Sequence, residues 1–276
     1  MNCVRFFRFV APTKALQPWV SGYWFLTDVD GAYTNRPIRT SPFCGAILNF
    51  SLSGQREVVG GPELSDVTFS GIQNHSLCWK MHAKFRDVLI IFALPGLVRL
   101  FPGMHATKDN LVDGYTMFDS RKIRALVADL TAARTPQASS ALLDQWLHNR
   151  LKQLSPPAEY QQLVAAHAML RDGTTVRHAA AQVKVSERQL ARWFKIHTGV
   201  GPKRIMDLER LVRSIRAHRG QGDPGASYSD QSHQIRTYKR FIGVSPTVYK
   251  RGLKDLPRDY LDSQASRTTP LLLAVG

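Results

Sequence analysis

A repeated segment constrains this chain more than any other feature of its sequence. The segments RWFKIHTGVGP (Arg192–Pro202) and RTYKRFIGVSP (Arg236–Pro246) align at one constant offset of 44 positions, from 192 to 236. Arg, Lys, Gly, Val and Pro recur at the same places. We expect each Gly to end a helix and each Pro to start the next one, because Gly tolerates the left-handed backbone of a helix end and Pro lacks only an amide that a helix start leaves unused. Two such units predict two similar helical modules.

The first repeat overlaps a short basic segment, SERQLARWFK (Ser186–Lys195), which predicts an amphipathic helix. Ser186 can cap this helix, and Gln189 three residues later completes a capping box. Three apolar residues at helical spacing share one face: Leu190, Trp193 and Phe194. The other face or its border then carries Arg188, Gln189, Arg192 and Lys195. Arg and Gln form paired hydrogen bonds with base edges, so the helix suits a DNA major groove. A solvated face on an ordinary surface helix is the alternative.

A second helix is predicted just upstream, over Thr175–Lys184 (TVRHAAAQVK). Its apolar residues recur at helical spacing: Val176, Ala179, Ala180 and Val183. Val185–Ser186 leaves room only for a tight turn between the two helices. Small Ala side chains allow two helices to approach closely, as a helix-turn-helix requires.

These segments resemble the C-terminal DNA-binding domain of AraC/XylS-type transcription regulators. The resemblance rests on SERQLARWFKIHTGVGPKRIMDLERL and YSDQSHQIRTYKRFIGVSPTVYKR and covers about Ala158–Gly252. In that family a long helix joins two helix-turn-helix units, and their recognition helices enter successive major-groove segments. The resemblance implies recognition helices at Glu187–Lys195 and at Asp230–Arg240.

The resemblance also implies which residues face DNA. In the first helix they are Arg188, Ala191 and Arg192, and Ala191 has only a methyl group to offer to a thymine methyl. In the second helix they are Gln231, Ser232, His233 and Arg236. With the neighbouring basic and amide side chains, the predicted DNA-binding residues are Arg188, Gln189, Ala191, Arg192, Lys195, Gln231, Ser232, His233, Arg236 and Lys239.

The second unit departs from the family pattern. The repeat offset places its supporting helix on Arg219–Ser229 (RGQGDPGASYS), where several Gly residues and Pro224 break helices. The family has a Leu/Ala-rich helix there. Gln234 also stands where the family usually has an apolar residue. We therefore expect a truncated second unit, whose recognition helix lacks a packing partner.

The charge of the chain points to a polyanionic partner. Its formal net charge is +16 and its sequence pI is about 10.2. Between Val176 and Asp255 there are 17 Lys and Arg against 6 Asp and Glu, so most of the excess lies in under a third of the chain. An anionic membrane surface is an alternative partner, but the chain has no long amphipathic basic helix with an aromatic face to lie on one.

The first 118 residues predict an all-β region, a small sandwich or barrel. Short β-rich runs are separated by Gly- and Pro-containing turns. The runs are Gly22–Val29, Cys44–Leu52, Asp66–Ile72, Leu77–Phe85 and Val88–Leu94. The region resembles the cupin-like sensor half of some AraC-type regulators.

A helical linker should follow the β region. Helices are predicted at Ser120–Leu130 and Ala141–Leu154, with a flexible break at Thr131–Ser140. Leu142–Leu154 should pack on the β region, with a dimer seam as the alternative. Ser155–Pro157 marks the expected boundary. The predicted domains are 1–155 (sensor or dimerisation, with the linker), 156–252 (DNA binding) and 253–276 (a tail, disordered or with Leu271–Val275 covering a groove).

We expect no enzyme activity, no cofactor and no bound metal. The His residues of the β region lack the close His-x-His pair of cupin metal sites: His75, His82 and His105. Its aromatic residues suit a core more than a small-molecule pocket: Trp19, Tyr23, Trp24, Phe25 and Trp79. Three distant cysteines, Cys3, Cys44 and Cys78, indicate free thiols in a reducing cytoplasm. Neither a signal peptide nor a membrane-spanning run is recognisable.

Together these features predict a cytoplasmic, sequence-specific DNA-binding transcription regulator that senses a small molecule through its N-terminal half. The implied partners are double-stranded DNA, RNA polymerase, a small-molecule effector and a second copy of the chain, and no membrane. Two alternatives stay open. One is a regulator relic that has lost specific DNA binding and acts through protein interaction. The other is a cupin-type metalloenzyme with a basic appendage.

Overall fold

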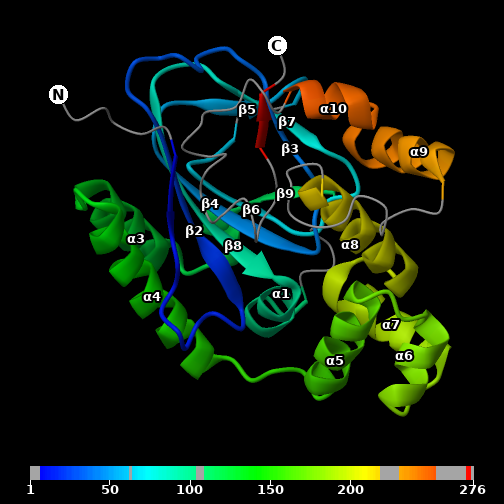
Figure 1. Ribbon diagram of the computed structural model, residues 1–276. Coiled ribbons are helices and arrows are strands. Elements are labelled where there is room, and N and C mark those ends of the chain that lie inside the picture. The colour runs from blue at the N-terminus through cyan, green and yellow to red at the C-terminus, as the bar shows by residue number, and fades with distance from the viewer. Residues whose placement is uncertain (1–6, 62–63, 104–108, 218–229, 253–271, 275–276) are drawn as a thin grey trace.

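The chain forms an N-terminal β-sheet region and a helical C-terminal part (Figure 1). The computed structural model describes residues 7–61, 64–103, 109–217, 230–252 and 272–274. No helix in these ranges is long and apolar enough to cross a bilayer.

The β region consists of two antiparallel sheets. The six-stranded sheet has the order β1 (Phe7–Val10), β2 (Val20–Asp28), β8 (Phe85–Ala93), β4 (Gly45–Ser53), β6 (Val67–Ser70) and β9 (Leu111–Asp113). The four-stranded sheet has the order β10 (Leu272–Ala274), β3 (Ile38–Thr40), β7 (Leu77–Met81) and β5 (Arg56–Val58). The predicted β-rich runs all coincide with strands. The strands β1, β3, β5 and β9 have only three or four residues each and were not predicted, because such short segments carry little pattern of their own.

Strand β8 is the centre of the larger sheet. It pairs with β2 on one side and β4 on the other, and Val88, Ile90, Ile91 and Phe92 are fully buried. A strand that is buried on both faces reads as a continuous apolar run, as VLIIFA does here. Tyr23 and Trp24 of β2 are also fully buried, so these two aromatic residues serve the core, as expected.

Helix α1 (Leu94–Leu100) follows β8 directly and was not predicted. The apolar run continues through it, and Pro95 lies in the first turn, where a missing amide costs nothing. Gly96 makes the close packing of α1 possible, since a Cβ at this position would lie 2.0 Å from the carbonyl oxygen of Trp19.

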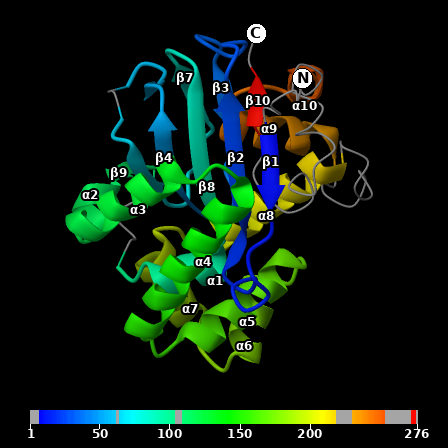
Figure 2. The same ribbon diagram turned by 90° about the vertical axis from the view of Figure 1, so that its left-hand side faces the viewer.

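Helices α2 (Gly114–Met117), α3 (Ser120–Ala132) and α4 (Pro136–Gln153) follow the β region, and α3 and α4 lie side by side against the larger sheet (Figures 1 and 2). The predicted flexible break at Thr131–Ser140 is wrong. Thr135 caps α4 by accepting a hydrogen bond from the Ala138 amide, so helix resumes at Pro136. Leu143 and Leu147 of α4 are fully buried, which agrees with packing on the β region.

The C-terminal part contains α5 (Tyr160–Arg171), α6 (Val176–Gln182), α7 (Glu187–Thr198), α8 (Pro202–Ala217), α9 (Gln231–Ile242) and α10 (Pro246–Gly252). The repeat correctly predicted where four of these helices begin or end. Gly199 and Gly243 end α7 and α9 with φ of 75° and 85°, and Pro202 and Pro246 begin α8 and α10.

Of the two expectations for the tail, disorder does not hold for residues 272–274, which lie within the Leu271–Val275 segment that was expected to cover a groove. Residues 272–274 form β10, which pairs with β3 at the edge of the smaller sheet. The rest of the tail lies outside the described residues, as does the Arg219–Ser229 segment that was expected to replace a helix in the second unit.

The contact of Gly96 with the Trp19 backbone yields a stability prediction. Gly96→Ala should lower the free energy of unfolding by about 2 kcal/mol, because a methyl group there overlaps backbone atoms that cannot turn away. Gly201→Ala is the matched control, since nothing lies within 4 Å of a Cβ there. Urea unfolding of both variants measures the difference, and an equal effect of the two would contradict the packing described for α1.

Candidate nucleic-acid interface and N-terminal cavity

Helices α6 and α7 form a helix-turn-helix. Thr175 caps α6 by accepting a hydrogen bond from the His178 amide at 3.2 Å, and Ser186 caps α7 by accepting one from the Gln189 amide at 3.1 Å. Lys184, in the turn between the helices, has φ of 59°. The predicted cap and turn are therefore confirmed. Close approach of the two helices depends on small side chains, and Ala179 and Ala180 are buried.

The two faces of α7 differ as predicted. Leu190 and Phe194 are fully buried. Arg188, Arg192 and Lys195 are exposed, and Gln189 and Ala191 are half-buried. Lys195 also donates from Nζ to the Gly199 carbonyl at 2.9 Å, so it contributes to the end of its own helix. The outer face of α7 thus presents guanidinium groups on a rigid, capped helix.

Helix α9 carries the second set of predicted residues. Asp230 caps it by accepting from the His233 amide at 2.6 Å. Gln231, Ser232, Arg236 and Lys239 are exposed, and His233 is half-buried.

The expectation that α9 lacks a packing partner is wrong. Tyr238, Phe241 and Ile242 are buried, and α9 contacts both α8 and α10. Gln234, which departs from the family pattern, donates to Ser214 Oγ of α8 at 3.1 Å. The amide of Gln234 therefore has a hydrogen-bond partner on the neighbouring helix.

The β region completes the carboxyl-terminal end of α9. The last carbonyls of a helix have no partner inside the helix. Here Ile242 O accepts from Arg39 Nη1 at 2.9 Å, and Phe241 O accepts from the Ser76 amide at 2.8 Å. His75 Nδ1 hydrogen bonds to Arg240 O at 3.2 Å. The N-terminal region thus supplies the cap that fixes α9.

Arg204 of α8 joins the same contact. Its Nε donates to Asn74 Oδ1 at 2.6 Å, and its Nη2 donates to the Asn74 carbonyl at 3.0 Å. Asp109 in turn accepts hydrogen bonds from the Asn74 backbone amide and from Asn74 Nδ2, each at 2.5 Å. The guanidinium carbon also lies 3.9 Å from the centre of the Phe241 ring. Burial lowers the pKa of Arg204 from its ordinary value, yet an arginine stays charged at any physiological pH.

A groove with four basic and two acidic lining residues, here called the basic groove, runs between α7 and α9, and its acidic residues are Glu187 and Asp207. Its lining includes Arg188 and Ala191 of α7, Lys203 and Arg204 of α8, and Arg240 of α9. The structure therefore brings two predicted DNA-binding residues together with three basic residues outside that set. None of the predicted DNA-binding residues of α9 lines this groove, and neither do Gln189, Arg192 and Lys195 of α7. Arg240 was missed because the family pattern places it one turn beyond the groove-facing positions.

The N-terminal region has a cavity between its two sheets that is partly open to solvent. Most of the surface that faces the cavity is apolar, and its apolar residues are Leu26, Ile38, Ile47, Trp79, Met81 and Leu89. Its polar residues are Thr40, Asn49, Arg56, Thr68, Ser70 and Asp87. Of the expected aromatic set, Trp79 therefore lines a cavity instead of the core.

A buried ion pair forms one wall of the cavity. Arg56 Nη1 lies 3.8 Å from Asp87 Oδ2, and Arg56 Nη2 donates to Thr68 Oγ1 at 2.9 Å. Burial raises the pKa of the Asp87 carboxyl and lowers the pKa of Arg56. Within the described part of the chain, Arg56 Nε and Asn49 Nδ2 are buried donors with no hydrogen-bond partner.

The structure does not bring the candidate histidines of the β region together. His75 binds the end of α9, and His82 pairs with Glu57 at 3.3 Å on the surface. His105 lies outside the described residues. Cys44 and Cys78 are free thiols, as predicted, and Cys3 also lies outside the described residues.

No protein-family model and no curated protein matches the sequence. Among solved structures, ToxT from Vibrio cholerae O395 is similar at 10% identity over 82% of this chain and 97% of that one, with a TM-score of 0.47. Unsaturated-fatty-acid-bound ToxT from V. cholerae strain SCE256 is similar at 12% identity over 82% and 94%, with a TM-score of 0.45. The AraC-like transcriptional activator CuxR is similar at 12% identity over 76% and 86%, with a TM-score of 0.24.

At these identities and TM-scores the likeness assigns no function to this chain, and the geometry of its own residues has to carry one.

The contact between Asn74 and Arg204 yields a prediction about how the two halves hold together. Hydrogen bonds to a charged group are worth about 1.5–3 kcal/mol. Asn74→Ala should therefore loosen the contact and raise the exchange rate of the Ser76 amide, which donates to Phe241 O, at least about tenfold. Hydrogen exchange measures this, with the Ile90 amide in the centre of the larger sheet as the internal control. Unchanged protection of Ser76 would show that the Asn74 side chain does not hold the halves together.

Proposed function

We propose that this chain is a sequence-specific DNA-binding transcription regulator of the AraC/XylS type. One observation carries the proposal. Helix α7 is capped by Ser186, contacts α6, buries Leu190 and Phe194, and exposes Arg188 and Arg192 on its outer face. A rigid helix that presents arginines is suited to bidentate hydrogen bonds with guanine in the major groove.

Helix α9 serves as the second reading element. Its exposed polar residues lie on one rigid element, because its buried face is fixed by α8 and by the β region. Helix α8 has 16 residues and is therefore about 24 Å long. It contacts both α7 and α9 and sets their spacing. Lys203, exposed at its start, is placed to contact a phosphate, and such contacts position a protein on DNA without reading sequence.

The proposal divides the chain at its linker. Helix α4 ends at Gln153 and α5 begins at Tyr160, so the short segment between them separates residues 1–155 from the DNA-binding residues 156–252. RNA polymerase and a second copy of the chain are the further partners that this kind of regulator implies, in the cytoplasm.

Arg192 tests the proposal directly. For DNA selected by the full chain from a random pool, Arg192→Ala should weaken binding by about 1–3 kcal/mol, or about 5–150-fold, and relax base choice at one position. The physical reason is the loss of a bidentate contact to a base edge. Fluorescence anisotropy on the selected duplex and on unrelated duplexes measures both effects.

The matched control is Arg121→Ala on α3, which removes an exposed arginine far from α7 in the chain. It should leave specific binding unchanged. An equal loss for Arg192→Ala on selected and unrelated DNA would mean that Arg192 only contacts phosphate. Failure of the wild-type chain to enrich any sequence would favour the relic that acts through protein interaction.

We further propose that the cavity between the sheets binds the effector. Its lining suits an apolar molecule, and the donors Arg56 Nε and Asn49 Nδ2 suit an acceptor oxygen on that molecule. Buried donors without partners are costly, so an acceptor placed between them would be stabilised.

Filling the cavity should abolish that binding. Ile47→Trp places a large ring in the cavity, so the affinity for 1-anilinonaphthalene-8-sulfonate, an apolar probe with acceptor oxygens, should fall at least about tenfold. Val59→Trp is the control, because Val59 is half exposed on the surface and should leave probe binding unchanged. Probe fluorescence in a titration measures both. Equal probe binding by the two variants would place the probe outside the cavity.

A further inference from the structure

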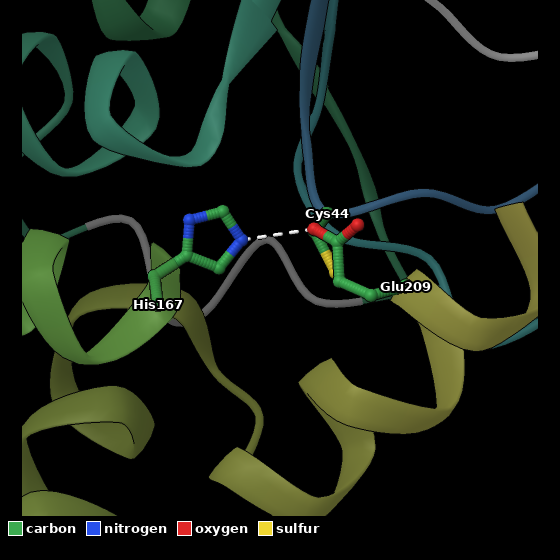
Figure 3. Close-up of side chains that lie close together, drawn as sticks. All are labelled: Cys44, His167 and Glu209. Carbon is green, nitrogen blue, oxygen red and sulfur yellow. Dashed lines mark hydrogen bonds and ion pairs between the residues drawn. The ribbon is translucent and has the colours of Figure 1, made fainter. Parts of the chain in front are cut away.

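Three potential metal ligands meet where the two halves of the chain join. Cys44 precedes β4 in the N-terminal region, His167 lies on α5 and Glu209 lies on α8. The sulfur, an imidazole nitrogen and a carboxylate oxygen all lie within 4.8 Å of one another. Figure 3 shows the three side chains meeting from three separate segments of the chain, with the ring of His167 directed at the carboxylate of Glu209.

Two of the three groups already interact. His167 Nε2 lies 2.9 Å from Glu209 Oε1, and both side chains are largely buried. A buried histidine–carboxylate pair alone is an ordinary structural contact. The same part of the chain provides such an example in His197 and Glu159, which lie 2.8 Å apart.

The thiol distinguishes the first pair from the second. Cys44 is buried, and its Sγ lies 3.6 Å from the Ile205 carbonyl and close to the Glu209 carboxylate. A neutral thiol is only a weak hydrogen-bond donor, so it satisfies a buried carboxylate poorly. A thiolate and a carboxylate together carry two negative charges, which a divalent cation neutralises in a buried place.

We propose that Cys44, His167 and Glu209 form a binding site for a divalent cation of the zinc type. Zinc takes sulfur, imidazole nitrogen and carboxylate oxygen, commonly with three protein ligands and a water in the fourth position. Tetrahedral zinc would hold the ligand atoms about 3.3–3.6 Å apart, given bond lengths of about 2.0–2.3 Å. The separations in the structure, 2.9 Å between His167 Nε2 and Glu209 Oε1 and no more than 4.8 Å between any two of the ligand atoms, lie on either side of those values.

A bound ion would tie the halves of the molecule together. One ligand belongs to the β region, and the other two belong to the helices that support the helix-turn-helix. The site is separate from the DNA-binding face of α7 and from the inner cavity, and it stands independently of the proposed function.

The test uses cobalt(II) as a spectroscopic substitute for zinc. The full chain carries Cys3→Ser and Cys78→Ser, so that Cys44 is the only remaining thiol. One equivalent of cobalt should give a thiolate-to-cobalt charge-transfer band in the near ultraviolet and the intense visible bands of a tetrahedral ion. One equivalent of zinc should displace the cobalt and raise the unfolding temperature, because an ion that binds only the folded chain stabilises it.

Substitutions then assign the ligands. In that background, Cys44→Ser should remove the charge-transfer band, and His167→Gln and Glu209→Gln should each weaken zinc binding at least about 100-fold. His197→Gln is the matched control, since it breaks the other buried histidine–carboxylate pair and should leave the band and the zinc affinity unchanged.

The cobalt spectrum of the chain that keeps Cys44, His167 and Glu209 decides the proposal even if a ligand variant fails to fold. Absence of a charge-transfer band at one equivalent of cobalt overturns it. So does a band that persists in Cys44→Ser, or a loss of affinity in His197→Gln as large as that in His167→Gln.

Discussion

The carboxyl-terminal end of α9 depends on the N-terminal region for its hydrogen bonds, and much of the structure depends on that contact. Three successive carbonyls, from Arg240 to Ile242, receive donors from β3 and from the segment before β7. Arg204 closes the contact from the α8 side by holding Asn74 and covering Phe241. Helix α9 is therefore positioned by two domains at once. Its orientation relative to α7 follows from how the halves are joined.

Helix α8 transmits this arrangement through the molecule. Its buried stripe includes Ile205, Leu208, Leu211 and Ile215. Along its length it meets the basic groove, the cluster of Cys44, His167 and Glu209, and the polar contact of Ser214 with Tyr238 at 3.2 Å. Packed helices with several such contacts have few intermediate arrangements, so a change at one contact is felt at the others. An effector in the proposed cavity site, or an ion at the proposed cation site, would thereby have a physical route to α7 and α9.

Local chemistry allowed the sequence to predict the first recognition helix in detail. The cap at Ser186, the buried Leu190 and Phe194, and the glycine that ends the helix all depend on neighbours within a few residues. The strands of the β region were predictable for the same reason, since period and turn residues are local signals. Helix α1 was missed because an apolar run buried on all sides has the same composition in a strand and in a helix.

Contacts between distant parts of the chain were beyond prediction. The residues of the β region that contact α9 lie more than 150 positions earlier in the chain. The sequence around α9 therefore indicated only that the usual supporting helix was absent. Gln234 looked like a defect because its partner, Ser214, lies on a different helix. The cluster of Cys44, His167 and Glu209 has no spacing motif, because its members come from three elements that only the fold brings together.

The central claim is that α7 and α9 read DNA from the major groove, held at a fixed spacing by α8. Dimethyl sulfate footprinting of the full chain on its selected duplex tests this directly, because the reagent methylates guanine N7 in the major groove. The account predicts two protected patches about 10 base pairs apart, on one side of the duplex. Protection of a single patch would leave α9 without a reading role, and the absence of any protection at guanine N7 would contradict the account.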